Sequence, residues 1–374
     1  MKSVPVQRTP EPAVGDSEGP RKIPRRGLPR GPSLPTRVLI GLVVVALVLL
    51  PQNESYYLMD LVVIACIYAT INVSWNLVLG FGGLFTFGQM AFFAIGGYTA
   101  ALMNIHLHLS PWLTTAGGAV TAGIAGAIVG LPSLRLYGPY MVLFTLAFQQ
   151  MIYVILVTDT SGFLGSGFGL QGLDNYTLPG VSDLNAPYYV GLGMLAVSVG
   201  LVGLLVRSPV GVAVQALRDS RSSTLARGVG LVKHRMIIFV VSAMITGVAG
   251  GYYAHYYSVI TPTLLEIGLL VNLLAMIIIG GVGSTWGVIA GTAALVYLND
   301  QLATQQQYSA ILWGAIIIVV VLLMPGGIAG AAQGLQRVVL TLVARALGKS
   351  PAQVPTQAKQ RALPLKALLT RRDR

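Results

Sequence analysis

Two short motifs resemble nucleotide-binding motifs, but neither meets the requirements of one. Residues 167–172 read G-F-G-L-Q-G, yet no strand–helix pattern surrounds them, so a dinucleotide site is not expected. Gly348-Lys349-Ser350 resembles the end of a phosphate-binding loop, but Val343 stands where that loop needs its first glycine. The chain is therefore not expected to hydrolyse ATP by itself or to be an enzyme.

The histidines and the cysteine do not predict metal or thiol chemistry. His106 and His108 are two candidate ligands, and no further ligands are evident beside them. Cys66 is the single cysteine and lies in an apolar run, which indicates a packed thiol. We also find no pairing of a nucleophile with a base. We expect no catalytic residue, no metal and no cofactor.

A glycine-rich break in an apolar region is the first pattern that indicates a function. Residues 79–89 read L-G-F-G-G-L-F-T-F-G-Q, and three glycines in four residues do not favour a helix. Non-helical backbone at membrane depth is tolerated only where it is buried or lines a cavity, and such breaks mark transport sites. Close packing through small residues is the alternative, and it explains Gly96 and Gly97 well. We predict a translocation pathway near this break, with these residues beside it: Gly82, Gly83, Thr86, Gln89, Thr145, Gln149 and Asn272.

Polar side chains inside the apolar runs are few. An amide in hydrocarbon is unfavourable unless it is paired, so these side chains should face the interior of a helix bundle. They include Asn72, Ser74, Asn76, Gln89, Thr145, Gln149, Gln150 and Asn272. No acidic or basic residue lies in the middle of a run, which argues against a proton relay or an ion-coupled carrier. A second glycine-rich stretch, 280–291, echoes the first in spacing and is a weak indication of an internal repeat.

The polar loop 207–235 contains a short amphipathic helix. Pro209 is placed to start it, and apolar residues follow at helical spacing up to Leu217. Such a helix can lie on lipid or dock into a groove of a partner. Docking is favoured because Arg218 and Asp219 present both signs of charge. We predict Leu217 as the apolar anchor of a coupling loop that includes Gly211, Ala216, Leu217, Arg218, Asp219 and Gly230.

The elements that carry these residues are membrane helices. The chain has 374 residues, of which 54% are hydrophobic and 10% charged, whereas a soluble domain carries about 25% charge. Most of its surface must therefore face lipid. Apolar segments recur at 38–50, 57–79, 86–104, 112–131, 139–157, 188–206, 236–257, 267–281, 285–299 and 308–324. A span needs about 20 residues, so we predict an all-α polytopic membrane protein with about ten transmembrane helices.

The positions of the charges give the orientation. A net charge of +12 could indicate nucleic acid, but Lys and Arg are absent from 38–134, 136–206 and 236–330. Alternation of ten spans places every basic stretch on one side, as the positive-inside rule requires. We therefore expect no nucleic-acid partner, and both termini and the loop 207–235 are predicted to be cytoplasmic. The outer loops then carry Glu54, Asp159, Asp174, Asp183 and Glu266.

Three regions follow from this topology. Residues 1–37 form a basic cytoplasmic tail, rich in Pro, Gly and Arg, that is expected to be disordered. Residues 38–330 form the transmembrane permease domain, and 331–374 form a second basic cytoplasmic tail. The longest outer loop, 158–187, is either a docking surface for an external partner or a long connector.

Seven stretches, in order along the chain, resemble the LivM-type permeases, which are membrane subunits of ABC importers for branched-chain amino acids. They are 80–102, 135–148, 165–170, 208–230, 253–262, 280–291 and 324–328, within a resemblance that covers about 38–330. Two stretches depart from the pattern. Relatives typically read closer to G-Q-L-S-L-G-H near residues 82–89, and they often carry an acidic residue at Gln149-Gln150. Both departures lie near the expected pathway and leave the substrate open.

The resemblance implies a partner permease of the LivH type, two cytoplasmic ATPase subunits and an extracytoplasmic solute-binding protein. It implies import of branched-chain or other hydrophobic amino acids across the inner (plasma) membrane, with the loop 207–235 transmitting the ATPase cycle. Urea, amides or another small organic solute are alternative substrates. A secondary carrier and a membrane scaffold are alternative classes; the missing mid-span charges count against the first, and the glycine breaks against the second.

Overall fold

The computed structural model describes residues 56–303, apart from 137, 181, 183, 184, 221–223 and 225–229, and also residue 314. The predicted segments 38–50 and 308–324, apart from residue 314, and both basic tails lie outside these residues. The count of ten helices and the position of the termini therefore stay predictions.

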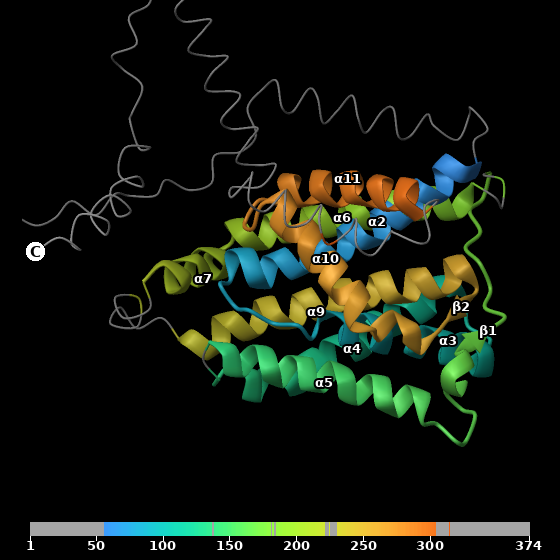
Figure 1. Ribbon diagram of the computed structural model, residues 1–374, viewed down its shortest axis with the longest axis horizontal. Helices are drawn as coiled ribbons and strands as arrows, with labels where there is room; N and C mark the ends of the chain where they lie inside the picture. The colour runs from blue at the N-terminus through green and yellow to red at the C-terminus, as the bar shows by residue number, and fades with distance from the viewer. Residues whose placement is uncertain are drawn as a thin grey trace, which may run out of the picture. The chain divides into compact units, whose positions relative to one another are not determined.

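The predicted all-α fold is confirmed for the described chain (Figure 1). The long helices are α2 (Tyr56–Asn76), α3 (Gln89–Leu107), α4 (Pro111–Ser133), α5 (Pro139–Val157), α6 (Ala186–Arg207), α7 (Pro209–Asp219), α9 (Leu231–Tyr257), α10 (Ile267–Gly280) and α11 (Thr285–Ala303). Short turns of helix are η2 (Leu77–Phe81), which is π-helical, and the 3-10 segments η3 (Ser166–Phe168) and η4 (Pro262–Leu265). The strands β1 (Leu170–Gln171) and β2 (Val259–Ile260) form one antiparallel pair, with Leu170 opposite Ile260.

Six of the described helices are long and apolar enough to cross a membrane: α2 with η2, α3, α4, α5, α6 and α9. The multi-pass membrane architecture predicted from the sequence is thus confirmed. Helix α10 is apolar but has only 14 residues. At about 1.5 Å per residue it is about 21 Å long, shorter than the roughly 30 Å of a hydrocarbon core.

The centre of the bundle is formed by α3, α4 and α9, which approach one another through glycines. A Cβ atom added to Gly96 of α3 would lie 2.4 Å from the Cα of Gly247 in α9. On the same two helices, a Cβ on Gly250 would lie 2.0 Å from the carbonyl oxygen of Phe93. Neither contact leaves room for a side chain. Close packing through small residues, the alternative that the sequence offered for Gly96, is what the structure shows.

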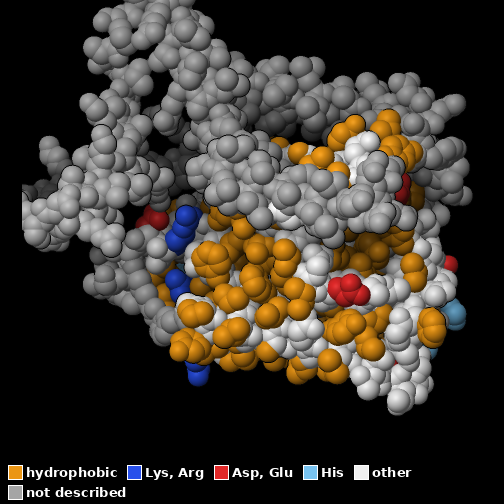
Figure 2. Space-filling model, viewed as in Figure 1, with side chains coloured by type: hydrophobic (Ala, Val, Ile, Leu, Met, Phe, Trp, Pro, Cys, Tyr) orange, Lys and Arg blue, Asp and Glu red, His pale blue; other side chains and the backbone are white. Residues whose placement is uncertain are grey.

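Helix α5 lies at the edge of the described bundle and exposes most of its length. Leu143, Met151, Val154 and Ile155 are all at least half exposed. Figure 2 shows the resulting apolar surface over α5 and its neighbours. In a membrane protein, such a surface faces lipid or another subunit.

The described Lys and Arg residues gather at the end of the bundle where α7 lies (Figures 1 and 2). They lie in the α4–α5 turn, at the end of α6, in α7 and at the start of α9: Arg135, Arg207, Arg218, Lys233 and Arg235. The positive-inside rule assigns this end to the cytoplasm.

At the opposite end, the loop between α5 and α6 is fixed to the bundle by hydrogen bonds. The side-chain Nδ2 of Asn104 donates to Oδ2 of Asp174 at 2.9 Å. The backbone N–H of Asp174 donates to Asn104 Oδ1 at 3.1 Å. The ring Nδ1 of His255 donates to the Asp174 carbonyl at 2.7 Å. The hydroxyl of Tyr176 lies 2.5 Å from that of Thr115. This loop is thus attached to α3, α4 and α9.

Candidate functional site

Two non-helical segments enter the bundle from opposite ends, and they form the centre of the candidate site. The first, 82–88, connects η2 to α3. The second, 258–266, connects α9 to α10 and contains β2 and η4. We call them the inner and the outer re-entrant segment, after the end from which each one enters.

The inner re-entrant segment turns back along α2. Gly83 has a φ of +64°, a conformation that glycine adopts without strain. The indole Nε1 of Trp75, near the end of α2, donates to the carbonyl of Thr86 at 2.8 Å. The backbone N–H of Phe87 then donates to the hydroxyl of Thr145 in α5 at 2.9 Å. The segment is therefore held between α2 and α5.

The outer re-entrant segment reaches the middle of the bundle. Ile260 packs against Gly97, the ninth of the 19 residues of α3. The side-chain Nε2 of Gln149, the eleventh of the 19 residues of α5, donates to the carbonyl of Leu265 at 3.1 Å. Glu266 follows directly and begins α10. The placement of Glu266 in an outer loop was therefore wrong, because the chain folds back into the bundle before α10 starts.

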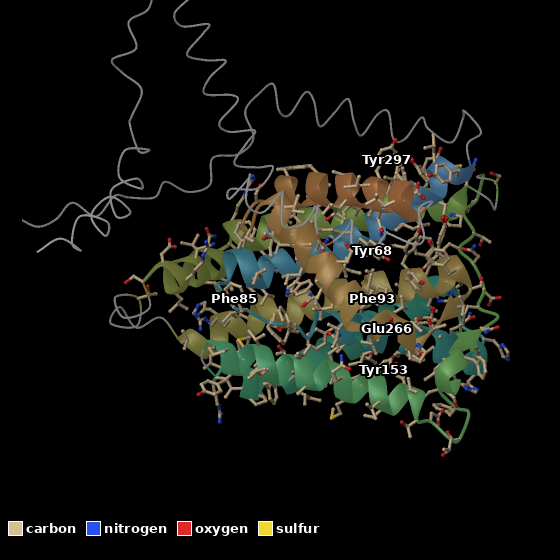
Figure 3. The ribbon with its side chains drawn as sticks, viewed as in Figure 1. Tyr68, Phe85, Phe93, Tyr153, Glu266 and Tyr297 are labelled. Atoms are coloured by element: carbon tan, nitrogen blue, oxygen red, sulfur yellow. The ribbon has the colours of Figure 1, made fainter. Side chains whose placement is uncertain are left out.

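Both segments meet the same face of α5. Thr145 holds the inner segment and Gln149 holds the outer one, and residues four apart are neighbours on one helix face. In the view of Figure 3, Glu266 lies between the two ends of the bundle, near Phe93 and Tyr153, and its side chain is exposed. The sequence predicted Thr145 and Gln149 as pathway residues, and the structure brings them together.

Several amide atoms near this meeting point have no hydrogen-bond partner among the described residues. Gln149 is fully buried, and its Oε1 is one of these atoms. The Nε2 of Gln150 and the Oδ1 of Asn272 in α10 are two more. Buried polar atoms without partners are rare in folded proteins and call for an explanation. Gln149, which is bonded to the outer re-entrant segment, is thus a group that could bind a passing solute.

Gln89 lies elsewhere. It is 1% exposed, and its Nε2 is within hydrogen-bond distance of three hydroxyls, those of Ser74, Ser242 and Thr246, at 3.1, 2.7 and 2.6 Å. This amide joins α2, α3 and α9 inside the protein. Its geometry is that of a structural cross-link between helices.

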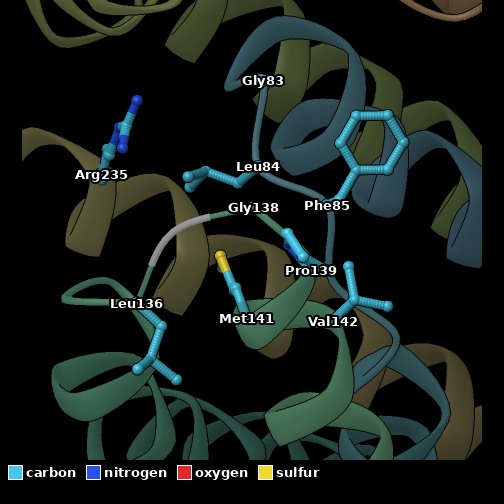
Figure 4. A pocket seen from close by; sticks show the side chains of 9 residues that line it. All are labelled: Gly83, Leu84, Phe85, Leu136, Gly138, Pro139, Met141, Val142 and Arg235. Carbon is cyan, nitrogen blue, oxygen red and sulfur yellow. The ribbon is translucent and has the colours of Figure 1, made fainter.

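A cavity of about 420 Å³ opens at the α7 end, between the inner re-entrant segment and α5 (Figure 4). Gly83, Leu84 and Phe85 line one wall, and Met141 and Val142 of α5 line another. Arg235 of α9 is the charged residue of the lining. Gly83 thus lies on the cavity, while Gly82 is buried beside it.

Helix α7 packs against the bundle through the apolar face that the sequence predicted. Gly211, Val214 and Leu217 are its buried residues, and Leu217 is 1% exposed. Leu217 therefore cannot be the exposed anchor that we expected, because its own chain already covers it. Val212, 44% exposed, and Ala216 are the apolar positions that α7 presents outward.

Arg218 connects α7 to both glycine-rich stretches. Its Nη1 donates to the carbonyl of Gly80 at the end of η2, and its Cγ would lie 2.8 Å from a Cβ on Gly83. The backbone N–H of Gly283, in the second stretch, donates to Asn76 Oδ1 at 2.8 Å. The two stretches that echo each other in sequence thus lie together beneath α7. Arg218 contacts its own chain and is not only a rim charge.

The remaining residues of the predicted coupling loop lie at its ends. Asp219 is exposed and is the last residue of α7. The carbonyl of Ala216 accepts a hydrogen bond from the Thr224 hydroxyl at 3.1 Å. Gly230 directly precedes α9, and His234 Nδ1 bonds its carbonyl at 2.7 Å.

Sequence reasoning missed the depth of Glu266 and the contact of Arg218 with Gly80. A signal for the first was the shortness of the run 267–281, since a short span leaves neighbouring residues inside the membrane. For the second, the sequence contained no signal, because the partner is a backbone carbonyl.

Comparison with known proteins places the chain among transport proteins. Residues 57–323 match the family model described as "Branched-chain amino acid transport system / permease component". The chain is 26% identical over 315 residues to the high-affinity branched-chain amino acid transport system permease protein LivM of Escherichia coli (strain K12), covering 78% of this chain and 74% of that protein. It is 25% identical over 315 residues to the LivH permease protein of the same system and strain, and the match covers 75% of this chain and 97% of that protein. No solved structure matches the chain significantly.

Proposed function

Because the chain belongs to the family of branched-chain amino acid transport permease components, we propose that it is the permease subunit of an ABC importer for branched-chain or other hydrophobic amino acids. It is a multi-pass inner-membrane protein and a transporter subunit. ATP hydrolysis then takes place in separate subunits.

The observation that carries this proposal is the meeting of the two re-entrant segments on α5. Irregular backbone at membrane depth is tolerated where it is buried in protein or lines a cavity, and broken segments of this kind form the binding sites of many transporters. Here one segment enters from each side, and neighbouring turns of α5 hold them at Thr145 and Gln149. The cavity beside Gly83 extends this route toward the cytoplasmic end.

The partners follow from what the chain leaves uncovered. The apolar face over α5 and α10 carries an exposed carboxylate, Glu266, which is unfavourable against lipid. A second permease subunit of the LivH type on this face would enclose the route between two chains. Two cytoplasmic ATPases would contact the outward side of α7, where Val212 and Ala216 are exposed.

The outer loop is proposed to receive the solute-binding protein. Phe168 is 84% exposed there, and the ring of Phe163 stacks on that of His106. The Ser161 hydroxyl and the Leu164 amide donate to the Asp159 carboxylate and hold its pKa below its ordinary value. A loop fixed in this way offers a preorganised docking surface.

Arg218 is the proposed transmission contact. A movement of α7 against the ATPases would act through Arg218 on the carbonyl of Gly80, directly before the inner re-entrant segment. The permease can thereby open or close its inner end without binding nucleotide.

The test is transport by the complete complex in ATP-loaded vesicles, with leucine-loaded binding protein outside. Leucine should accumulate inside, and only when all subunits are present. Replacement of Gly83 by Leu should abolish uptake while the ATPases stay bound, because a side chain at this positive φ meets Arg218. Normal uptake by Gly83→Leu, or no leucine uptake by the wild-type complex, would reject the proposal.

A further inference from the structure

Glu266 is the exposed charged group of an otherwise apolar region. It directly precedes α10 as its N-cap residue, and neither α10 nor α5 contains any charged residue. Figure 2 shows an acidic patch among hydrophobic and uncharged atoms, and Figure 3 labels Glu266 at that place. An exposed carboxylate at this depth is unfavourable unless a cation approaches it. Its side chain has no hydrogen-bond or ion-pair partner in the part of the chain that the structure describes.

The first turn of α10 offers the opposite charge at the same place. The backbone N–H groups of Ile267, Gly268 and Leu269 have no acceptor within the helix by their position. The Glu266 side chain does not cap them. Together with the helix dipole, these donors attract an anion. A Cβ added to Gly268 would meet no atom within 4 Å, so the space at this turn is open.

A third observation points independently to a bound solute. Gln149 is fully buried, and its Nε2 is bonded to the carbonyl of Leu265, the residue before Glu266. Its Oε1 has no partner among the described residues. A buried acceptor without a donor therefore belongs to the side chain that bonds the residue before Glu266, and an ammonium group at this place could supply the missing N–H.

We propose that Glu266 and the first turn of α10 form a binding station for the zwitterionic head of an α-amino acid, a site that rests on the proposed transport function. The ammonium group would pair with the Glu266 carboxylate, and the amino-acid carboxylate would accept from the amides of α10. These two groups are bonded to one carbon atom, which suits a site where a carboxylate and the free amides of a helix start lie on adjacent residues. The aliphatic side chain would lie on Ile267 and Val271, which are 53% and 48% exposed.

The proposed site would bind α-amino acids in preference to neutral solutes. Urea or an amide has no ammonium to neutralise Glu266, so it would leave the carboxylate uncompensated. The charge pair would also hold the solute between the two re-entrant segments while the outer end closes.

The test uses the complete complex in ATP-loaded vesicles with leucine-loaded binding protein, and it measures leucine moved per ATP hydrolysed. Glu266→Gln should lower this ratio at least tenfold, with binding-protein-stimulated ATP hydrolysis within twofold of wild type. Gly268→Leu, which fills the space at the helix start without a change of charge, should lower it similarly. The control Asp300→Asn removes a carboxylate from α11, away from both re-entrant segments, and should leave the ratio unchanged.

Three results would overturn the proposal. An unchanged ratio in Glu266→Gln would show that the carboxylate does not act on the solute. A loss of the other subunits from purified Glu266→Gln complex would show that Glu266 is an interface ion pair instead. Full uptake in Gly268→Leu would exclude the amides of α10. A wild-type complex that hydrolyses ATP but moves no leucine would instead reject the proposed function, and only the wild-type measurement reports on that.

Discussion

The guanidinium of Arg218 donates a hydrogen bond to the carbonyl oxygen of Gly80, 138 residues earlier in the chain. The contact joins α7, which lies at the end of the bundle, to the last turn of η2 before the inner re-entrant segment. It therefore connects the proposed ATPase contact directly to the start of the proposed solute route.

Replacement of Arg218 by Ala should uncouple ATP hydrolysis from transport. A hydrogen bond from a charged group contributes about 1.5–3 kcal/mol, so we expect leucine uptake to fall about tenfold or more. The ATPases should still co-purify, because the outward side of α7 is unchanged. The control is Arg207→Ala, which removes an exposed arginine at the end of the adjoining helix. Equal uptake in the two variants would show that the contact of Arg218 with Gly80 does not couple ATP hydrolysis to transport.

Replacement of Gln89 by Leu should destabilise the fold more than it impairs transport. The change removes an amide that lies within hydrogen-bond distance of three buried hydroxyls and should lower the free energy of unfolding by roughly 1–3 kcal/mol. The measurement is the thermal unfolding midpoint in detergent beside uptake per folded complex, with the exposed amide of Gln171 replaced by Leu as control. If uptake were lost while the thermal unfolding midpoint stayed unchanged, Gln89 would act in the translocation pathway, as the sequence predicted.

Acidic replacements at Val212 and Leu217 should distinguish a residue that binds the ATPases from one that stabilises the fold of the permease. Val212 is 44% exposed, so Val212→Asp should release the ATPases while the permease stays folded. Leu217 is 1% exposed, and an aspartate there would be buried without a partner, at a cost of several kcal/mol. We expect Leu217→Asp to lower the yield of folded permease. A stable Leu217→Asp permease that merely loses the ATPases would support the original anchor instead.

Cysteine labelling of intact cells should establish the orientation. In a Cys66→Ala background, a cysteine at exposed Gly167 should react with a membrane-impermeant thiol reagent, since a Cβ there meets no atom within 4 Å. A cysteine at Ser220, after α7, should react only when the membrane is opened. Labelling of the Ser220 cysteine in intact cells would show that the predicted orientation is wrong.

Much of the fold was predictable because lipid imposes a simple rule on the sequence. Long apolar runs between basic stretches predicted α2 to α6 and α9 within a few residues at each end. The polar residues of these runs were expected to face inward, and Asn72, Ser74 and Asn76 are fully buried.

The outer re-entrant segment was not predictable from hydropathy. Residues 258–266 contain Ser, Thr, Pro and Glu, a composition that is typical of an outer loop. Their depth depends on the strand pair with β1 and on the contact with Gln149, which join residues far apart in the chain. A window of local hydropathy contains neither interaction.

The candidate site was predictable in its residue types but not in the role of each residue. An amide inside a span can cross-link helices or face a solute, and the sequence is the same in both cases. Gln89 does the first, while Gln149 lies at the meeting of the two segments. An amphipathic helix such as α7 can likewise turn its apolar face to its own chain or to a partner, and Leu217 turns to its own chain.

The glycine contacts among α3, α4 and α9 also decide which parts of the permease can move. Backbones that touch at Gly96 and Gly250 leave no space for these helices to move closer together, so we expect α3, α4 and α9 to move as one unit. Reorientation between outward and inward states would then be taken up by the two re-entrant segments, which are hydrogen-bonded to α5 at Thr145 and Gln149.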